Sequence, residues 1–373
     1  MLLALAGVAA TGQAPSVRWE PLSTGVSARL RGIHAVSAQI AWASGERGTV
    51  LRTTDGGRTW QPRPVTGAEA LDFRDIEAWS ETTAVAMSAA PGEGSRIYRT
   101  EDGGATWSLR YTATEAAMFL DAIAFVDGAR GVAVSDAVAG RFVVLTTADG
   151  GRSWTRIPPE ALPPALEGEG AFAASGTNVA VRGTHVWIAT TASRVLHSPD
   201  AGRTWSVATT PVATGQASGI FSIAMRDDRH GLVVGGVYTK EREAVDNAAA
   251  TDDGGRTWRA APGLSGYRSV VAPLRARGPR AWIAVGPSGA DVSDDDGVRW
   301  TPAGGEGYDA LSMAPDGSVG YASGSAGRIA RVTHREGAVS DRAAIPRLSR
   351  TARWDTAPYL GDRPPRRTSS VRR

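Results

Sequence analysis

Residues 53–60 read T-T-D-G-G-R-T-W, and the chain carries this pattern six times. The other copies run over residues 100–107, 147–154, 198–205, 251–258 and 293–300. Each has Ser or Thr, then Asp two residues on, Gly two later and Trp three after that. The gaps between successive aspartates are 47, 47, 51, 53 and 42 residues. A period of about 40–50 residues is typical of repeated β-blades.

The pattern, which we call the Asp box, makes physical sense as a turn. An Asp side chain can accept bonds from backbone N–H groups of its own turn. Glycines permit the positive φ that such turns demand, and a Trp supplies a large apolar face. We therefore interpret the boxes as structural and not catalytic. Their aspartates are Asp55, Asp102, Asp149, Asp200, Asp253 and Asp295, and their tryptophans are Trp60, Trp107, Trp154, Trp205, Trp258 and Trp300.

Every unit has four short strand-like stretches separated by turn residues, with no helical periodicity. Four-stranded repeats of this length are propeller blades. We expect innermost strands to open near residues 30, 73, 120, 172, 220 and 267, and those of a seventh, unboxed unit near Tyr308. That unit lacks a fourth strand, and Val17–Leu22 resembles one. The sequence thus predicts an all-β fold: a seven-bladed β-propeller of four-stranded antiparallel blades over residues 16–335, closed by the N-terminal strand.

The two ends of the chain differ from the repeats. Residues 1–15 are apolar, with small residues at a plausible cleavage point, which favours a secretory signal and a periplasmic or secreted protein. They lack a basic start, so a frayed apolar terminus is the alternative. The stretch is too short to span a bilayer. Residues 336–373 hold nine Arg against four acids and are expected to be disordered. Basicity is thus confined to this tail, and nucleic-acid binding is not indicated.

Several chemistries have no motif in the sequence. Cys is absent, which excludes disulfides and thiolate sites, and the five His have no metal-ligand spacing. No glycine-rich dinucleotide fingerprint follows a strand and opens a helix. The aspartate runs 252–253 and 294–296 resemble calcium ligands, but both lie inside boxes. We expect no cofactor and no metal.

The boxes and the strands of small residues, such as Ala41-Trp42-Ala43-Ser44-Gly45, resemble the bacterial neuraminidase-repeat, or Asp-box, propellers. Among these, residues 42–57 are most similar to the unit of the photosystem II stability/assembly factor family. The resemblance covers roughly residues 17–333. It implies a seven-bladed ring and a non-enzymatic assembly scaffold. Nothing in the sequence itself shows a photosystem partner.

Aligning the expected inner strands places one side chain per blade at the mouth of the central channel. Arg binds carboxylates bidentately, so this ring would suit an anionic or carbohydrate ligand, or a partner protein. Mutual ion pairing around a wet channel is the alternative. The aligned residues are Arg31, Arg74, Asp121, Phe172, Phe221, Arg268 and Asp309, and Tyr267 and Tyr308 precede two of them.

The favoured function is therefore a scaffold or binding protein that does no chemistry. The alternative is a glycoside hydrolase of sialidase type, in which Arg31, Arg74 and Arg268 would hold a substrate carboxylate beside a Tyr–Glu pair. The only Arg-Ile-Pro motif, residues 156–158, follows the third box, which is the wrong place for that family. A charged loop over residues 238–247 is a candidate determinant of specificity.

Overall fold

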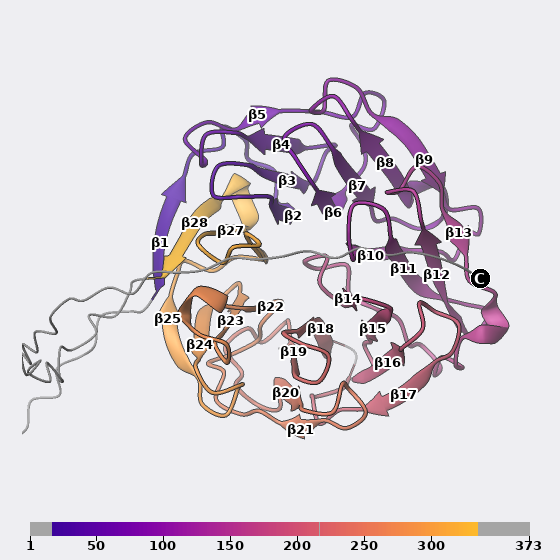
Figure 1. Cartoon of the computed structure of the whole chain (residues 1–373), viewed down its shortest axis with the longest axis vertical. Helices are drawn as coiled ribbons and strands as arrows, with labels where there is room; N and C mark the ends of the chain where they lie inside the picture. The colour runs from indigo at the N-terminus through magenta and orange to yellow at the C-terminus, as the bar shows by residue number, and fades with distance from the viewer. Residues whose placement is uncertain (1–16, 216, 335–373) are drawn as a thin grey trace, which may run out of the picture. The chain divides into compact units, whose positions relative to one another are not determined.

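In a computed structural model of the chain, residues 17–215 and 217–334 are described. They form seven four-stranded antiparallel sheets around a central axis (Figure 1). The described helices are short 3-10 turns, η1 (Gly92–Gly94), η2 (Pro159–Ala161), η3 (Arg275–Arg277) and η4 (Ser325–Gly327), and none of them is long and apolar enough to cross a membrane. The predicted seven-bladed propeller is confirmed. The expected signal segment and basic tail lie outside the described residues.

Each blade runs from an inner strand at the axis to an outer strand at the rim. Blade one comprises β2 (Leu30–Ala35), β3 (Ala41–Gly45), β4 (Val50–Thr53) and β5 (Gln61–Pro62). Blade two comprises β6 (Phe73–Ala78), β7 (Ala84–Ser88), β8 (Arg96–Thr100) and β9 (Ser108–Thr112). Blade three comprises β10 (Leu120–Phe125), β11 (Gly131–Val138), β12 (Arg141–Thr147) and β13 (Thr155–Arg156). Blades four and five comprise β14 (Val179–Arg182), β15 (His185–Ala189), β16 (Arg194–Ser198), β17 (Ser206–Thr209); and β18 (Ser218–Met225), β19 (Gly231–Val237), β20 (Ala248–Thr251), β21 (Arg259–Ala260). Blades six and seven comprise β22 (Val270–Pro273), β23 (Trp282–Gly286), β24 (Gly289–Ser293), β25 (Thr301–Gly304); and β26 (Ala310–Met313), β27 (Gly320–Ser323), β28 (Ile329–His334) with β1 (Val17–Leu22).

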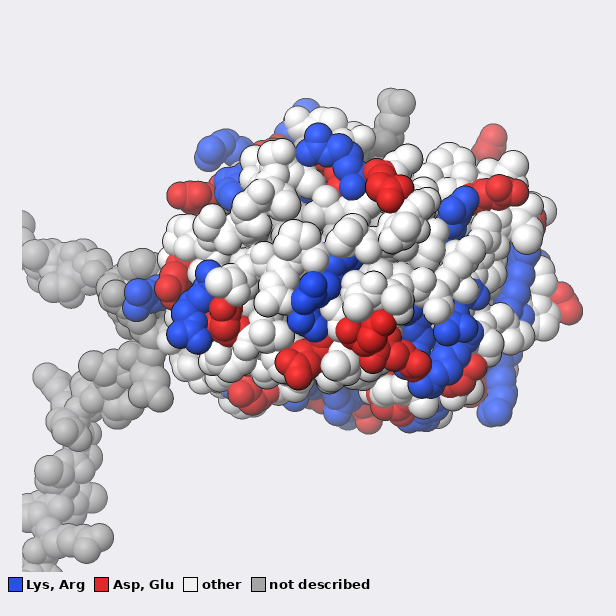
Figure 2. Space-filling view, turned by 90° about the horizontal axis from the view of Figure 1, so that it is seen from above, with Lys and Arg blue, Asp and Glu red and all other residues white. Residues whose placement is uncertain are grey.

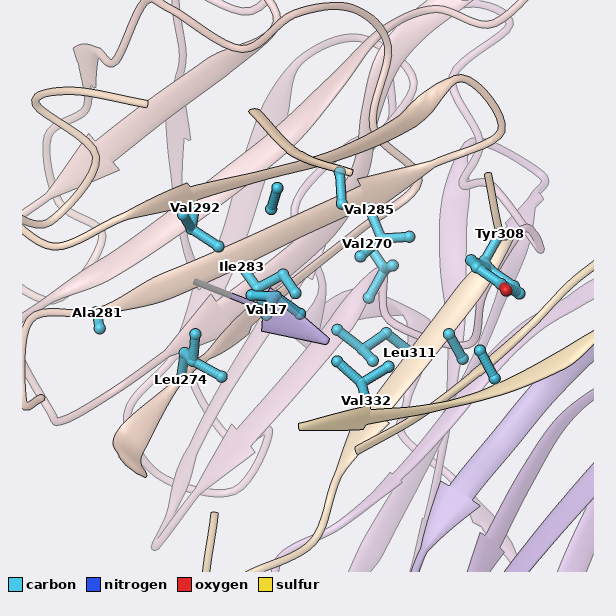
Figure 3. Close-up of a cluster of buried hydrophobic side chains, with 14 residues drawn as sticks. Val17, Val270, Leu274, Ala281, Ile283, Val285, Val292, Tyr308, Leu311 and Val332 are labelled. Atoms are coloured by element: carbon cyan, nitrogen blue, oxygen red, sulfur yellow. The ribbon is translucent and has the colours of Figure 1, made fainter. Parts of the chain in front are cut away.

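The N-terminal strand closes the ring, as the sequence predicts. β1 pairs antiparallel with β28 from Val17↔His334 to Leu22↔Ile329. Val17 is buried in the cluster between blades six and seven, near Ile283 and Leu311 (Figure 3). Pairing β1 with β28 removes an open sheet edge that would otherwise template aggregation.

Each box forms a hydrogen-bonded turn between the third and fourth strands of its blade. In the first box, Gly57 N–H donates to Thr53 Oγ1 (2.9 Å), and Thr59 donates from N–H to Asp55 Oδ1 (2.9 Å) and from Oγ1 to Asp55 Oδ2 (2.7 Å). Gly56 and Gly57 have φ of 78° and 89°, where a side chain would be strained. The fourth strand begins one residue after each box Trp.

These turns predict acid sensitivity. Hydrogen bonds from the residue four positions on lower the pKa of Asp55, Asp102, Asp149 and Asp200 to about 2. The unfolded-state pKa is near 3.9, so this stabilisation is complete above about pH 5 and is lost as pH falls through 4 to 2. Urea midpoints should therefore fall steeply over that interval. Asp102→Asn should show a smaller fall than wild type; an identical pH profile would contradict the assignment.

Candidate functional site at the channel mouth

A cavity of about 400 Å³ opens where the inner strands begin, at the end of the ring opposite the boxes. Six residues named from the sequence line it: Arg31, Arg74, Phe172, Phe221, Tyr267 and Asp309. The structure adds Arg29, Ala173, Ala174, Tyr238, Glu241, Ser269 and Pro287. The site therefore combines a cationic side with an aromatic side.

A repeated irregularity of the backbone orients the mouth residues. In four blades the inner strand skips one residue in its pairing with the second strand, between Leu30 and Gly32 in blade one. A β-bulge of this kind re-aims the side chain of the extra residue. The residues skipped in the pairing are Arg31, Arg74, Asp121 and Phe221.

Arg31 is the distinctive cation of the cavity. Burial lowers its pKa, and the neighbouring Arg29 and Arg74 lower it further. Among the described residues no salt bridge involves Arg31, and its buried Nε has no hydrogen-bond partner. Arg29 instead binds Asp309 with two bonds of 2.7 Å, and Arg74 Nε lies 2.7 Å from Asp72 Oδ2. Arg31 is thus the guanidinium available to an anionic ligand.

The opposite wall is aromatic. Phe172 and Phe221 stack with their ring centroids 3.7 Å apart, and Tyr267 meets Phe221 edge-on at 4.7 Å. Tyr238 lies across both phenylalanines and is 46% exposed, so it is open to a ligand. Tyr238 begins the charged loop 238–247, which also places Glu241 in the cavity. Burial and then the charge of Asp309 raise the pKa of Tyr267 well above its usual value.

The expectation that blade four opens near residue 172 is wrong: its inner strand, β14, begins at Val179. Residues 172–178 instead lie beneath the mouth and bond to blades on opposite sides of the axis. Gly176 has φ 71°, and a Cβ there would overlap the carboxyl of Asp75 in blade two. The bonds join Arg74 Nη1 to Ala173 O (3.4 Å), Ser175 Oγ to Ser269 O (2.8 Å) and Thr177 Oγ1 to Ser222 Oγ (2.8 Å). Three residues of this plug segment, Phe172, Ala173 and Ala174, line the cavity.

Arg268 does not reach the cavity, contrary to its assigned place in the ring. Ser269 occupies the position equivalent to Arg31, because Val270 pairs with Val285 as Gly32 pairs with Ser44. A one-residue shift sends a side chain to the other face of a strand. Arg268 is 1% exposed and its Nη2 lies 2.6 Å from Asp291 Oδ2. The three-arginine cluster named for the sialidase alternative is therefore not formed.

Two further predicted residues lie outside the cavity lining. Asp121 is fully buried, neither of its oxygens has a hydrogen-bond partner, and burial followed by the charge of Asp136 raises its pKa well above the usual value. Tyr308 stacks on Trp19 with ring centroids 5.3 Å apart. The sequence analysis did not name Arg29. Its position two residues before Arg31 could have indicated it, since residues two apart on an extended segment share a face.

Two aspartates of the run 294–296 pair with arginines. Asp294 pairs with Arg277, and Asp296 pairs with Arg226 and Arg280. Over residues 17–215 and 217–334, no group of three or more His, Cys, Asp or Glu is arranged to hold a metal. Acidic and basic side chains are interspersed on the face seen in Figure 2.

Comparison with known proteins supports the resemblance. Residues 11–108, about a quarter of the chain, match the family model described as photosynthesis system II assembly factor YCF48. The resemblance to an Asp-box propeller of this kind is confirmed. No curated protein gave a significant match.

Solved structures show the same fold at low identity. The structure titled "YCF48 bound to D1 peptide" has a TM-score of 0.57 and 17% identity, covering 87% of this chain and 97% of that one. The WD40 propeller domain of Doa1 has a TM-score of 0.58 and 12% identity, covering 86% and 98%. The GH74 enzyme of Niastella koreensis has a TM-score of 0.55 and 13% identity, covering 84% of this chain and 53% of the enzyme.

Proposed function

We propose that this chain is a non-enzymatic scaffold that binds a peptide segment of a partner protein at the channel mouth. The observation that carries the proposal is Arg31, a largely buried cation with no acidic partner among the described residues, facing a cavity with an aromatic wall. A carboxylate would pair with its guanidinium. A neighbouring apolar side chain of the peptide would pack against Phe221 and Tyr238. The ligand class is therefore a peptide bearing a carboxylate beside an apolar residue.

Two findings from the comparisons support a peptide as the ligand. The family model that matches residues 11–108 describes an assembly factor. A propeller of similar fold, YCF48, was solved with the D1 peptide bound. We also propose export to the periplasm or secretion, on the composition of residues 1–15 alone.

The test is a set of end-labelled ten-residue peptides that end in Phe or Leu, made with either a free or an amidated C-terminus and titrated by fluorescence anisotropy. We expect members with a free carboxylate to bind. Arg31→Ala should weaken binding roughly tenfold to a hundredfold, because a charge-assisted hydrogen bond contributes about 1.5–3 kcal/mol. Arg47→Ala, at an exposed Arg outside the cavity, is the matched control and should bind as wild type does. Equal affinity of the Arg31 and Arg47 variants would refute the proposal.

The sialidase alternative is tested on the same proteins. Arg29, Arg31 and Arg74 do line one cavity, as carboxylate recognition requires. However, the raised pKa of Tyr267 is the opposite of what a nucleophilic phenolate needs. We expect no turnover of a fluorogenic sialoside. Turnover that is lost in Arg31→Ala would replace the scaffold with the hydrolase.

A further inference from the structure

A second cavity, of about 420 Å³, lies between blades three and four at the box end of the ring, away from the mouth. The ends of β11 and β12 and the turn between β14 and β15 surround it. The family resemblance assigns this cavity no role, and the proposed peptide site does not include it. Among its lining residues are Val132, Thr146, Asp149, Val181, Thr184 and His185.

The other blade interfaces show what usually fills this space. In five of the other clusters the box Trp of one blade packs with a second ring at the box end, whereas Trp19 of β1 stacks on Tyr308 between blades six and seven. Trp107 meets Trp42 at 6.2 Å, and Trp60 meets Tyr321 at 6.1 Å. The second ring in the other clusters is Phe125 with Trp79 beside Trp154, Trp187 beside Trp258, and Trp282 beside Trp300.

Three of the second rings carry a hydrogen-bond donor that bonds to the following blade. Trp42 Nε1 donates to Ser80 O (3.0 Å), Trp187 Nε1 to Gly254 O (2.9 Å) and Tyr321 Oη to Ala38 O (2.9 Å). Trp42, Trp187 and Tyr321 occupy one register position, opposite the residue before the box in their blades. In three of the seven blades, an indole or phenol at this position therefore bonds to the following blade.

The same register position is aliphatic in the other four blades, at Val85, Val132, Leu232 and Ile283. Rings from other positions fill the interfaces beside Val85 and Leu232, but not the interface of blade three. In blade three the residue at that position, Val132, pairs with Thr146. Trp205 packs in the cluster between blades three and four, and the other aromatic ring there, Phe142, belongs to the opposite end of β12. The turn of blade four that corresponds to Ala38 and Ser80, at Gly183 and Thr184, lines the cavity. A ring-sized space with an acceptor turn on its far side remains.

The charged groups around this cavity already have partners. Arg130 Nη2 lies 2.8 Å from Asp127 Oδ2. Asp149 accepts two bonds from Ser153. His185 Nδ1 and His197 Nε2 are 2.9 Å apart, and burial followed by the neighbouring His185 lowers the pKa of His197 to about 4. The hydrogen-bonding positions of these groups are thus already occupied, which favours a neutral ligand.

We propose that the cavity between blades three and four binds a neutral planar aromatic molecule with one N–H or O–H donor, of the indole or phenol class. Its volume falls within the range of small-molecule sites, about 300–1,000 Å³. The ligand's ring takes the place of the second ring found at the other interfaces, and its donor meets the Gly183–Thr184 turn.

The test uses indole as the probe and ligand-observed NMR with the full chain. We expect saturable binding, and about fivefold weaker binding of 1-methylindole, which lacks the N–H donor. Val132→Trp restores the missing ring and should abolish binding without lowering the midpoint of thermal unfolding. Val132→Phe is a smaller replacement and provides the same test should the Trp variant fail to fold.

Val85 occupies the same register position in blade two, where the rings of Trp79, Phe125 and Trp154 already fill the interface. Val85→Phe should therefore lower the unfolding midpoint, whereas Val132→Phe should not. Arg31→Ala should bind indole as wild type does, because the mouth is a separate site. Absence of indole binding to wild type, or unchanged binding in a folded Val132→Phe variant, would overturn the proposal.

Discussion

A chain that starts at Ser23, and so lacks β1, is expected to lose its stable monomeric fold. The deletion removes the pairing of six residues with β28 and the burial of Val17 and Trp19. The indole of Trp19 also donates to Ala303 O at 3.0 Å. Removing one packed Trp side chain typically costs about 3–5 kcal/mol, and the deletion exposes a sheet edge as well. Size-exclusion chromatography should show aggregates, and urea unfolding should lose cooperativity.

Two point variants in β1 distinguish the loss of ring closure from a general effect of changing the N-terminal strand. Trp19→Ala should destabilise the propeller by about 3 kcal/mol. Glu20→Ala changes an exposed residue of the same strand and should stay within about 0.5 kcal/mol of wild type. If the shortened chain unfolds at the urea midpoint of the full chain, then β1 does not hold the ring closed.

Arg268→Met is expected to destabilise the fold by about 3–5 kcal/mol, because it leaves Asp291 buried without its counter-charge. The two side chains are 1% and 0% exposed. Arg268 also donates from Nη2 to Ser265 Oγ at 2.6 Å, so the variant breaks a network and not one bond. The measurement is the free energy of unfolding from urea titration followed by circular dichroism.

The double variant Arg268→Met with Asp291→Leu provides the control. It removes both charges, so it should recover much of the loss that the single variant suffers. If Arg268 instead held a ligand at the mouth, the single variant would weaken peptide binding at unchanged stability. That result would restore the place that the sequence alignment assigned to it.

The candidate site was predictable in part, blade by blade. Arg31, Arg74 and Asp309 line the cavity as the alignment of apolar patterns indicated. Arg268 was misplaced because the apolar pattern of blade six was aligned one residue too early: Val270 is the counterpart of Gly32, so Ser269 is the counterpart of Arg31. Successive side chains of a strand face opposite sides, so an alignment that slips by one residue assigns the wrong side chain to the axis.

The plug segment could not be predicted from the sequence, for a different reason. Residues 172–178 contain an apolar stretch that reads as the start of an inner strand. Their backbone instead accepts bonds from distant blades, from Arg74 Nη1 at Ala173 O and from Ile223 N–H at Thr177 O. Local propensity is a weak prior when partners from other blades can satisfy the backbone.

The sequence by itself determined the ring. The six boxes set the turns and the period, and the unboxed seventh unit required the N-terminal strand, because both features follow from local turn chemistry and from counting strands. The tertiary structure decided the sites. Arg31 is free among the described residues, whereas Arg29 and Arg268 are paired with carboxylates. Asp309, the partner of Arg29, lies far from it in the sequence, and Asp291, the partner of Arg268, lies on β24 of the same blade. The space beside Val132 exists only because two blades meet there without a second ring. Charge pairing and packing between segments distant in sequence are properties of the assembled ring, so no single repeat could disclose them.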